Sequence, residues 1–178
     1  TSDMARLPRA IIREFPEYYR WYSQREFTWN EISQPNRNGL LARDPSVDGV
    51  KTGMTEAAGY CLVSSAKRDG MRLIAVVAGT KSMKAREDAS LALLNYGFNF
   101  YETRALKKAG EELAVQRVYR ARGGRAAVGL ARDLTVTLPR GQAERAEFTV
   151  ELAPRVFAPL TKSDRVGVLR ALVDRKVV

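Results

Sequence analysis

Three consecutive residues, Lys51, Thr52 and Gly53, offer groups that could bind a carboxylate and admit a substrate backbone. The lysine carries a fixed positive charge, and the threonine hydroxyl can donate a hydrogen bond to a carboxylate. Gly53 has no side chain, so an extended substrate could lie against the strand at this point. A motif of three residues is weakly specific, and the alternative interpretation is a solvated lysine before a turn.

The residues around this tripeptide predict an antiparallel sheet. Residues 47–50 read as a turn followed by a short apolar step. Two β-type runs follow, at residues 60–65 and 72–77, and residues 67–70 join them with the sequence Lys-Arg-Asp-Gly. Asp-Gly between two such runs is a strong hairpin signal. We therefore expect Lys51 and Thr52 on a strand beside this hairpin.

Helices are predicted on either side of this sheet in the sequence. Residues 2–15 and 83–101 carry apolar side chains at helical spacing. Arg86 lies in the first turn of the second helix, where the helix dipole disfavours a cation. We expect either a special role for Arg86 or a surface ion pair with Glu87 or Asp88.

The segment between the first helix and the sheet is irregular. Residues 17–29 hold six aromatic side chains, for which an aromatic groove and packing onto a core are both open interpretations. Residues 34–45 contain Pro, Asn and Gly and predict a loop. Arg37 in this loop is a candidate for the edge of a site.

The composition excludes several kinds of chemistry. The chain has no histidine, which removes Ser-His-Asp triads, Cys-His pairs and histidine metal sites. Its single cysteine, Cys61, cannot form an internal disulfide and is expected to be a buried structural thiol. No zinc-ligand spacing or Gly-rich phosphate loop occurs, so we expect no metal and no cofactor.

The charge of the chain suits anionic partners without identifying one. The formal net charge is +10, but acidic residues are interspersed throughout. The densest basic stretch, residues 117–132, contains one aromatic residue, Tyr119, so no stacking platform for nucleic acid is predicted. A solvated basic surface is the favoured interpretation. No apolar run approaches the about 18 residues that a membrane-spanning helix requires.

From residue 105 onward the sequence predicts a small all-β module. Short alternating runs are separated by turn signals that contain Gly, Pro, Asp or Ser. The runs are residues 112–119, 126–130, 134–138, 146–152 and 165–173.

Several stretches in one order resemble a known family. They are TSDMARLPRAIIREFPEYY, EFTWNEISQPNRNGLL, VDGVKTGMTEAAGYCLVSSAKRDGMRLIAVVAG and KAREDASLALLNYGFNFYET. Together they are similar to serine D-alanyl-D-alanine carboxypeptidases of the penicillin-binding protein five and six type. The resemblance is close over residues 1–104 and looser over residues 105–178, where LTVTLPRG is the best stretch.

The resemblance implies an α+β fold in two parts. Residues 1–104 would be the C-terminal part of a penicillin-recognising, β-lactamase-like domain, in which helices flank an antiparallel sheet. Residues 105–178 would form a β-rich second domain. The implied chemistry is acyl transfer, in which a serine of a Ser-x-x-Lys motif attacks the D-Ala–D-Ala amide of a peptidoglycan stem peptide. β-Lactam antibiotics acylate the same serine in this family. Its members are periplasmic and attach to the inner membrane by a C-terminal anchor.

The resemblance also implies roles for individual residues. Lys51 would serve the electrostatics and proton traffic of the cleft, and Thr52 would bind the terminal carboxylate. Arg86 matches an arginine that supports carboxylate binding, and Arg37 matches one at the cleft edge. The backbone N–H of Met54 matches one of two oxyanion-hole donors.

The nucleophile motifs of the family are missing from the sequence. Ser-x-Asn occurs nowhere, and the single Ser-x-x-Lys string, residues 64–67, follows Lys-Thr-Gly and ends a predicted strand. We treat that string as a chance match. We expect the nucleophile and the membrane anchor on polypeptide outside these residues, and no turnover by this chain alone. The alternative is a non-catalytic basic module that binds peptidoglycan or a protein partner.

Overall fold

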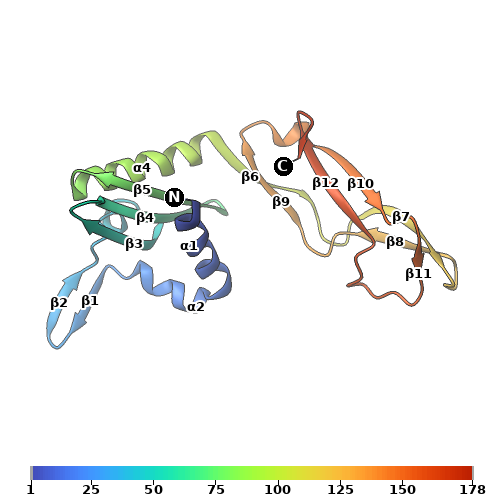
Figure 1. Ribbon diagram of the computed structural model, residues 1–178, viewed down its shortest axis with the longest axis horizontal. Helices are drawn as coiled ribbons and strands as arrows, with labels where there is room; N and C mark the ends of the chain where they lie inside the picture. The colour runs from blue at the N-terminus through green and yellow to red at the C-terminus, as the bar shows by residue number, and fades with distance from the viewer. Residues whose placement is uncertain (1, 178) are drawn as a thin grey trace. The chain divides into compact units, whose positions relative to one another are not determined.

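The computed structural model describes residues 2–177 and divides into two compact units. The first is Thr1–Phe100 and the second is Tyr101–Val178. The fold is mixed α+β, with helices and an antiparallel sheet in the first unit and β-strands in the second (Figure 1). No helix of the described residues is long and apolar enough to cross a membrane.

The first unit is built on the antiparallel sheet β3-β4-β5. Its strands are β3 (Val47–Thr55), β4 (Gly59–Arg68) and β5 (Met71–Thr80). Asp69 and Gly70 both have positive φ, at 46° and 81°, in the turn between β4 and β5. A two-residue turn with two positive φ angles matches the twist of a hairpin. The predicted hairpin is therefore confirmed.

Helices cover the sheet, and the five consecutive residues 62–66 of its central strand β4 are all buried. Helix α4 (Met83–Phe100) packs on β4 and β5, and α1 (Ser2–Glu14) also contacts β5. Figure 1 shows α4 on one side of the sheet and α1 on the other. The core between sheet and helices includes Leu62 and Leu94, each 1% exposed. Both predicted helices are present, with ends within one residue of those expected.

The segment between α1 and β3 contains more structure than predicted. It forms α2, η1, the hairpin β1-β2 and α3. Their bounds are Pro16–Tyr19, Arg20–Ser23, Glu26–Trp29, Ile32–Pro35 and Leu40–Arg43. The prediction of a plain loop over residues 34–45 is therefore wrong. Of the six aromatic residues in 17–29, only Tyr19 is buried, so general packing onto a core is also wrong.

The second unit consists of three small sheets. The sheet β6-β9 pairs Tyr101–Lys107 with Leu134–Pro139. The other two are β11-β7-β8 and β10-β12-β13. Their strands are β7 (Glu112–Tyr119), β8 (Arg125–Gly129), β10 (Glu147–Leu152), β11 (Val156–Phe157), β12 (Gly167–Val173) and β13 (Lys176–Val177). The one regular helix of this unit is the short η2 (Ala143–Arg145), among its described residues.

Candidate active-site wall

The edge strand β3 carries Lys51, Thr52 and Gly53 near its C-terminal end. Lys51 is exposed, and its Nζ donates a hydrogen bond to the carbonyl oxygen of Thr52 at 2.6 Å. Thr52 is half-buried. Successive side chains on a strand point to opposite faces, so the two groups flank the strand. Within the described residues β3 pairs only with β4, which leaves its other edge open to an extended ligand.

Gly53 has neither crowding nor an unusual backbone angle to explain it. A Cβ added there would meet only the Cβ of Cys61, at 3.8 Å, which is ordinary van der Waals contact. Gly53 is not among the glycines with positive φ. Cys61 lies opposite Gly53 in the ladder and is half-buried, so the expectation of a buried thiol is wrong.

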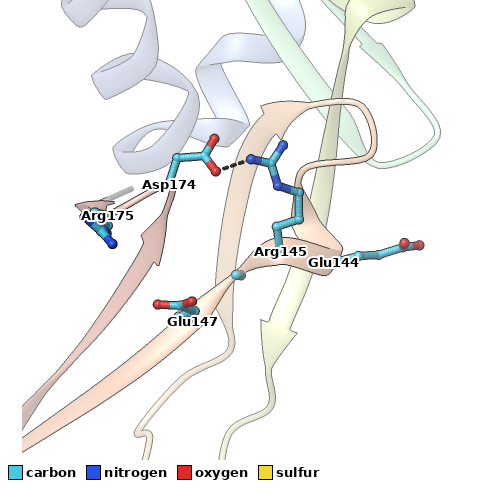
Figure 2. A pocket seen from close by; sticks show the side chains of 6 residues that line it. Glu144, Arg145, Glu147, Asp174 and Arg175 are labelled. Carbon is cyan, nitrogen blue, oxygen red and sulfur yellow. Dashed lines mark hydrogen bonds and ion pairs between the residues drawn. The ribbon is translucent and has the colours of Figure 1, made fainter.

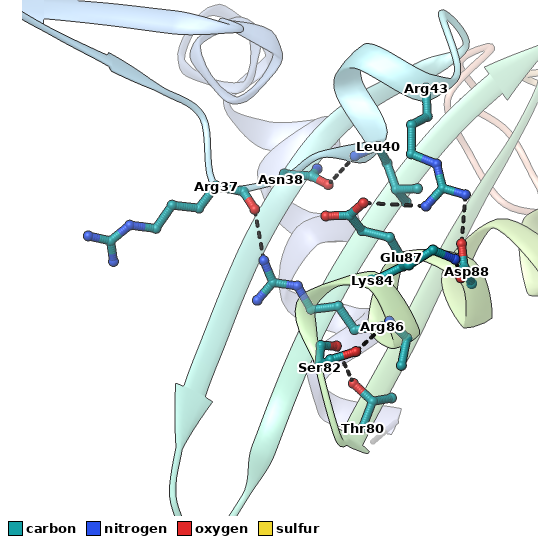
Figure 3. A network of polar contacts seen from close by, with 11 residues as sticks. Arg37, Asn38, Leu40, Arg43, Thr80, Ser82, Lys84, Arg86, Glu87 and Asp88 are labelled. Carbon is teal, nitrogen blue, oxygen red and sulfur yellow. Dashed lines mark hydrogen bonds and ion pairs between the residues drawn. The ribbon is translucent and has the colours of Figure 1, made fainter.

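Arg86 lies buried at the start of α4 and reaches the loop before β3 (Figure 3). Its side chain is 3% exposed, and Nη2 donates to the carbonyl oxygen of Arg37 at 2.8 Å. The guanidinium carbon lies 5.9 Å from the ring centroid of Tyr60, which pairs with Met54 of β3. The buried Nε of Arg86 has no hydrogen-bond partner among the residues described. Arg86 is thereby connected to β3 through both the loop and Tyr60.

The loop between β2 and α3 is fastened to β3. The side-chain amide of Asn38 donates to the carbonyl oxygen of Gly49 at 3.2 Å, and its Oδ1 accepts from the backbone N–H of Leu40. Arg37 contributes its backbone to this arrangement. Its side chain is exposed and points away from Arg86 in Figure 3.

Neighbouring acidic residues do not neutralise Arg86. Glu87 and Asp88 form ion pairs with Arg43, at 3.3 and 2.7 Å. Asp88 also accepts from Lys84 at 2.7 Å. The alternative prediction of a surface arginine paired with Glu87 or Asp88 is therefore wrong, and the local cost of a cation in this turn is real.

A charged pair that the sequence did not reveal fixes the first half of β3. Arg72 on β5 makes two hydrogen bonds to the carboxylate of Asp48, both at 2.7 Å. The Tyr19 hydroxyl donates to the same carboxylate at 2.7 Å. Burial raises the pKa of Tyr19 far above its usual value, so this hydroxyl remains a donor. This polar cluster joins β3, β5 and α2. The sequence did not predict it, because its three residues lie far apart along the chain.

A second polar cluster supports the start of β3. Arg68 donates to Asp44 at 2.6 Å and to Asn95 of α4 at 3.0 Å. Asp44 also accepts from the hydroxyl and the backbone N–H of Ser46. Burial alone would raise the pKa of Asp44, but the hydrogen bonds from Ser46 and Arg68 outweigh it and lower that pKa overall.

The other features that could hold a site lie elsewhere. Ser64, of the single Ser-x-x-Lys string, is 0% exposed within β4 and cannot meet a substrate in this conformation. An apolar cavity of about 520 Å³ is lined by Ile11, Phe15, Tyr18, Trp21 and Tyr22. A charged hollow of about 530 Å³ in the second unit is spanned by the Arg145–Asp174 ion pair (Figure 2). Among residues 2–177 no cluster of three or more His, Cys, Asp or Glu side chains could hold a metal.

An antiparallel sheet whose edge strand carries Lys-Thr-Gly, with covering helices and a following β module, is the arrangement that the resemblance to penicillin-binding proteins implied. Family models agree with this fold. Residues 1–82 match the D-alanyl-D-alanine carboxypeptidase family, and residues 101–178 match the C-terminal domain of penicillin-binding protein 5. The chain belongs to the penicillin-binding protein 5 family of D-alanyl-D-alanine carboxypeptidases.

Individual relatives support the same family. The chain is 42% identical to the D-alanyl-D-alanine carboxypeptidase DacA of Escherichia coli K12, over 99% of this chain and 44% of that protein. It is also 42% identical to the Haemophilus influenzae DacA, over 98% and 45%. The crystal structure of penicillin-binding protein 5 from Haemophilus influenzae matches with a TM-score of 0.86, covering 99% of this chain and 52% of that one. The chain thus spans about half or less of the length of these relatives.

Proposed function

We propose that this chain supplies one wall of the active site of a serine D-alanyl-D-alanine carboxypeptidase acting on peptidoglycan stem peptides. The observation that carries the proposal is the connection between the open edge of β3 and the buried Arg86. Lys51 and Thr52 flank that edge, while Arg86 reaches it through Tyr60 and the carbonyl of Arg37. The Thr52 hydroxyl and the buried charge of Arg86 would then act on one small anion, the terminal carboxylate, while Lys51 lies on the other face of the strand.

Each group of the wall has a distinct task in the proposed reaction. The Thr52 hydroxyl donates a hydrogen bond to the terminal carboxylate, and the buried charge of Arg86 strengthens that binding from behind. The positive charge of Lys51 stabilises the negative charge that develops in the transition state, and its amino group assists proton transfer. The backbone N–H of Met54 is one oxyanion donor, of a type worth about 3 kcal/mol in the transition state. Neither crowding nor backbone strain requires a glycine at position 53. We therefore assign Gly53 the role of letting the substrate backbone approach β3.

The chemical step is acyl transfer to a serine. The serine oxygen bonds to the carbonyl carbon of the penultimate D-Ala, the amide C–N bond breaks, and the serine proton passes to the departing D-Ala nitrogen. Water then hydrolyses the ester and restores the serine. A β-lactam forms an ester with the same serine, and because the broken C–N bond lies in its ring, no fragment is released. The reaction requires neither a metal nor a cofactor.

The attacking serine, in this proposal, belongs to polypeptide outside these 178 residues. Three observations support that placement: the sequence lacks Ser-x-Asn, Ser64 is buried, and the chain covers 44% of the Escherichia coli DacA length. Apolar side chains on α1, α2 and η1 are also widely exposed, among them Leu7 at 58% and Trp21 at 54%. Further polypeptide would cover such a surface. We propose a periplasmic location and an inner-membrane anchor, also outside these residues.

Replacement of Thr52 in the source protein tests the wall. Thr52→Val removes the hydroxyl and keeps the shape, whereas Thr52→Ser keeps the hydroxyl. A hydrogen bond to a charged group is worth about 1.5–3 kcal/mol, so Thr52→Val should lower kcat/KM for D-Ala release by about 10- to 100-fold. Thr52→Ser should stay near the parent value. Equal rates for Thr52→Val and the parent protein would refute a role of this hydroxyl in carboxylate binding.

A non-catalytic module that binds peptidoglycan is the second candidate. Five exposed arginines of the second unit favour it, because none of them forms an ion pair among the described residues: Arg117, Arg120, Arg122, Arg125 and Arg155. A source protein that neither releases D-Ala nor reacts with a fluorescent penicillin, yet binds cell-wall sacculi, would decide for this candidate.

A further inference from the structure

The sheet β11-β7-β8 has one buried face and one exposed face with a distinctive composition. Gln116 and Val118 of β7 are buried, at 6% and 4% exposed. The alternate residues of the same strand, Val115, Arg117 and Tyr119, therefore project from the other face. Val115 is 52% exposed and Arg117 is also exposed. This outer face of β7, β8 and β11 is called the β7 face below.

Two aromatic rings form a continuous platform on the β7 face. Phe157 of β11 lies directly beside Tyr119 in the parallel ladder. Their ring centroids are 5.4 Å apart with an interplanar angle of 34°. Phe157 is 51% exposed, and the guanidinium of Arg117 lies 4.9 Å from the Tyr119 ring centroid. Large aromatic side chains exposed beside arginine are the composition that interface hot spots favour.

The platform adjoins positive charge that no described acidic side chain neutralises. Arg117 and Arg125 are directly opposite each other in the β7-β8 ladder. Like charges in that position are destabilising, so the pair costs the sheet stability. Three further exposed arginines lie at the turn and before β11: Arg120, Arg122 and Arg155. Within the described residues none of the five arginines forms an ion pair.

We infer that the β7 face is a second binding surface for peptidoglycan, distinct from the β3 wall. The apolar faces of sugar rings would lie on Tyr119 and Phe157, and carboxylates of stem peptides would bind the guanidinium groups of Arg117 and Arg125. Guanidinium is suited to this because it binds carboxylates through paired N–H groups and stacks on aromatic rings. Charge complementarity favours this occupant, since an exposed arginine cluster with no acidic partner attracts an anionic ligand.

This inference rests on the proposed function, because peptidoglycan is the polymer on which the proposed carboxypeptidase acts. It adds that the second unit holds the polymer independently of the catalytic chemistry. The source protein would then retain affinity for sacculi after a β-lactam has blocked its active site. The failure of either proposal can be recognised separately, because D-Ala release from a short soluble peptide reports the β3 wall alone.

The decisive variant is Arg125→Glu in the source protein. It replaces a repulsive cross-strand pair by an attractive one opposite Arg117, so the protein should unfold at the same or a higher temperature. Affinity for purified sacculi, measured by sedimentation after penicillin treatment, should nevertheless fall at least about tenfold, as expected for loss of one charged contact. Tyr119→Ala/Phe157→Ala tests the aromatic platform and should weaken binding by a similar factor.

The matched control is Arg132→Glu/Arg175→Glu, which changes the net charge more but lies off the β7 face, in the turns before β9 and β13. It should change sacculus affinity by less than about twofold, because exposed charges away from the ligand are screened by salt. Equal losses for the control and for Arg125→Glu would overturn the inference, since they would show general attraction of a basic protein. The inference would also be overturned if Tyr119→Ala/Phe157→Ala bound sacculi as tightly as the parent protein did, and if both proteins were retained equally on dextran sulfate.

Discussion

Replacing Asp48 by Asn should loosen the strand that carries Lys-Thr-Gly. Asp48 accepts two hydrogen bonds from Arg72 and one from Tyr19, and its own side chain is 30% exposed. The Asn amide keeps the shape and one acceptor oxygen. It loses the charge and turns the second acceptor of Arg72 into a donor.

The magnitude follows from the partial burial of this pair. Breaking a fully buried ion pair costs about 3–5 kcal/mol, whereas an exposed pair contributes roughly 0–1 kcal/mol. With Arg72 25% and Asp48 30% exposed, we expect a loss of about 2 kcal/mol. For a unit of this size, that corresponds to a fall in Tm of roughly 8–16 °C.

Circular dichroism at the helix band is a suitable assay because the helices α1, α2, α3 and α4 all belong to the first unit. Thermal unfolding followed this way reports that unit and not the β module. Asp88→Asn is the matched control, since its ion pairs with Arg43 and Lys84 are more exposed. Its Tm should change much less. A shift for Asp48→Asn no larger than that of the control would refute the role assigned to the Asp48–Arg72 pair.

Three further predictions concern the sheet and its support. Gly53→Ala should leave Tm nearly unchanged, because the new Cβ meets only Cys61, yet it should slow penicillin acylation of the source protein; unchanged acylation would argue against substrate approach at this glycine. Gly59→Ala should destabilise the first unit by more than about 1 kcal/mol in urea unfolding, because φ is +63° and the Cβ would lie 2.8 Å from the carbonyl oxygen of Thr80; a neutral effect would contradict the described turn. Asp44, whose pKa is lowered on folding, stabilises the fold above its unfolded pKa of about 3.9 and loses that contribution as pH falls through the folded pKa. Asp44→Asn should therefore be less stable than the parent chain near neutral pH, and its free energy of unfolding in urea should fall less as the pH is lowered. An unchanged fall with pH would exclude Asp44 as a source of the acid dependence of stability.

Local signals explain what could be predicted of the fold. Asp69-Gly70 has the residue types that a tight hairpin requires, so β4 and β5 follow from the sequence. The β1-β2 hairpin was missed because its turn places Asn30 and Glu31 at positive φ without a glycine. The four-residue helix Leu40–Arg43 is too short to display a helical period.

The sequence allowed residues of the candidate site to be proposed, but it did not reveal the contacts that connect them. The position of Arg86 in the first turn of α4 already indicated an unusual environment, because a cation there is unfavourable. Its bond to the carbonyl of Arg37 spans 49 residues, and the Asp48–Arg72 pair spans 24. Such contacts depend on how the sheet, loop and helix come together, which periodicity and propensity do not specify. The prediction that the aromatic residues of 17–29 pack onto a core was wrong for a related reason, since their burial depends on which segments lie against them.

The location of the acylated serine tests the central claim most directly. The source protein would be treated with a β-lactam and digested, and the peptide carrying the added mass would be identified by mass spectrometry. We predict that the label lies on a serine outside residues 1–178, and that the isolated 178-residue chain takes up no label. A label on Ser64, or on any other serine of this chain, would contradict the assignment of β3 as a wall without its own nucleophile.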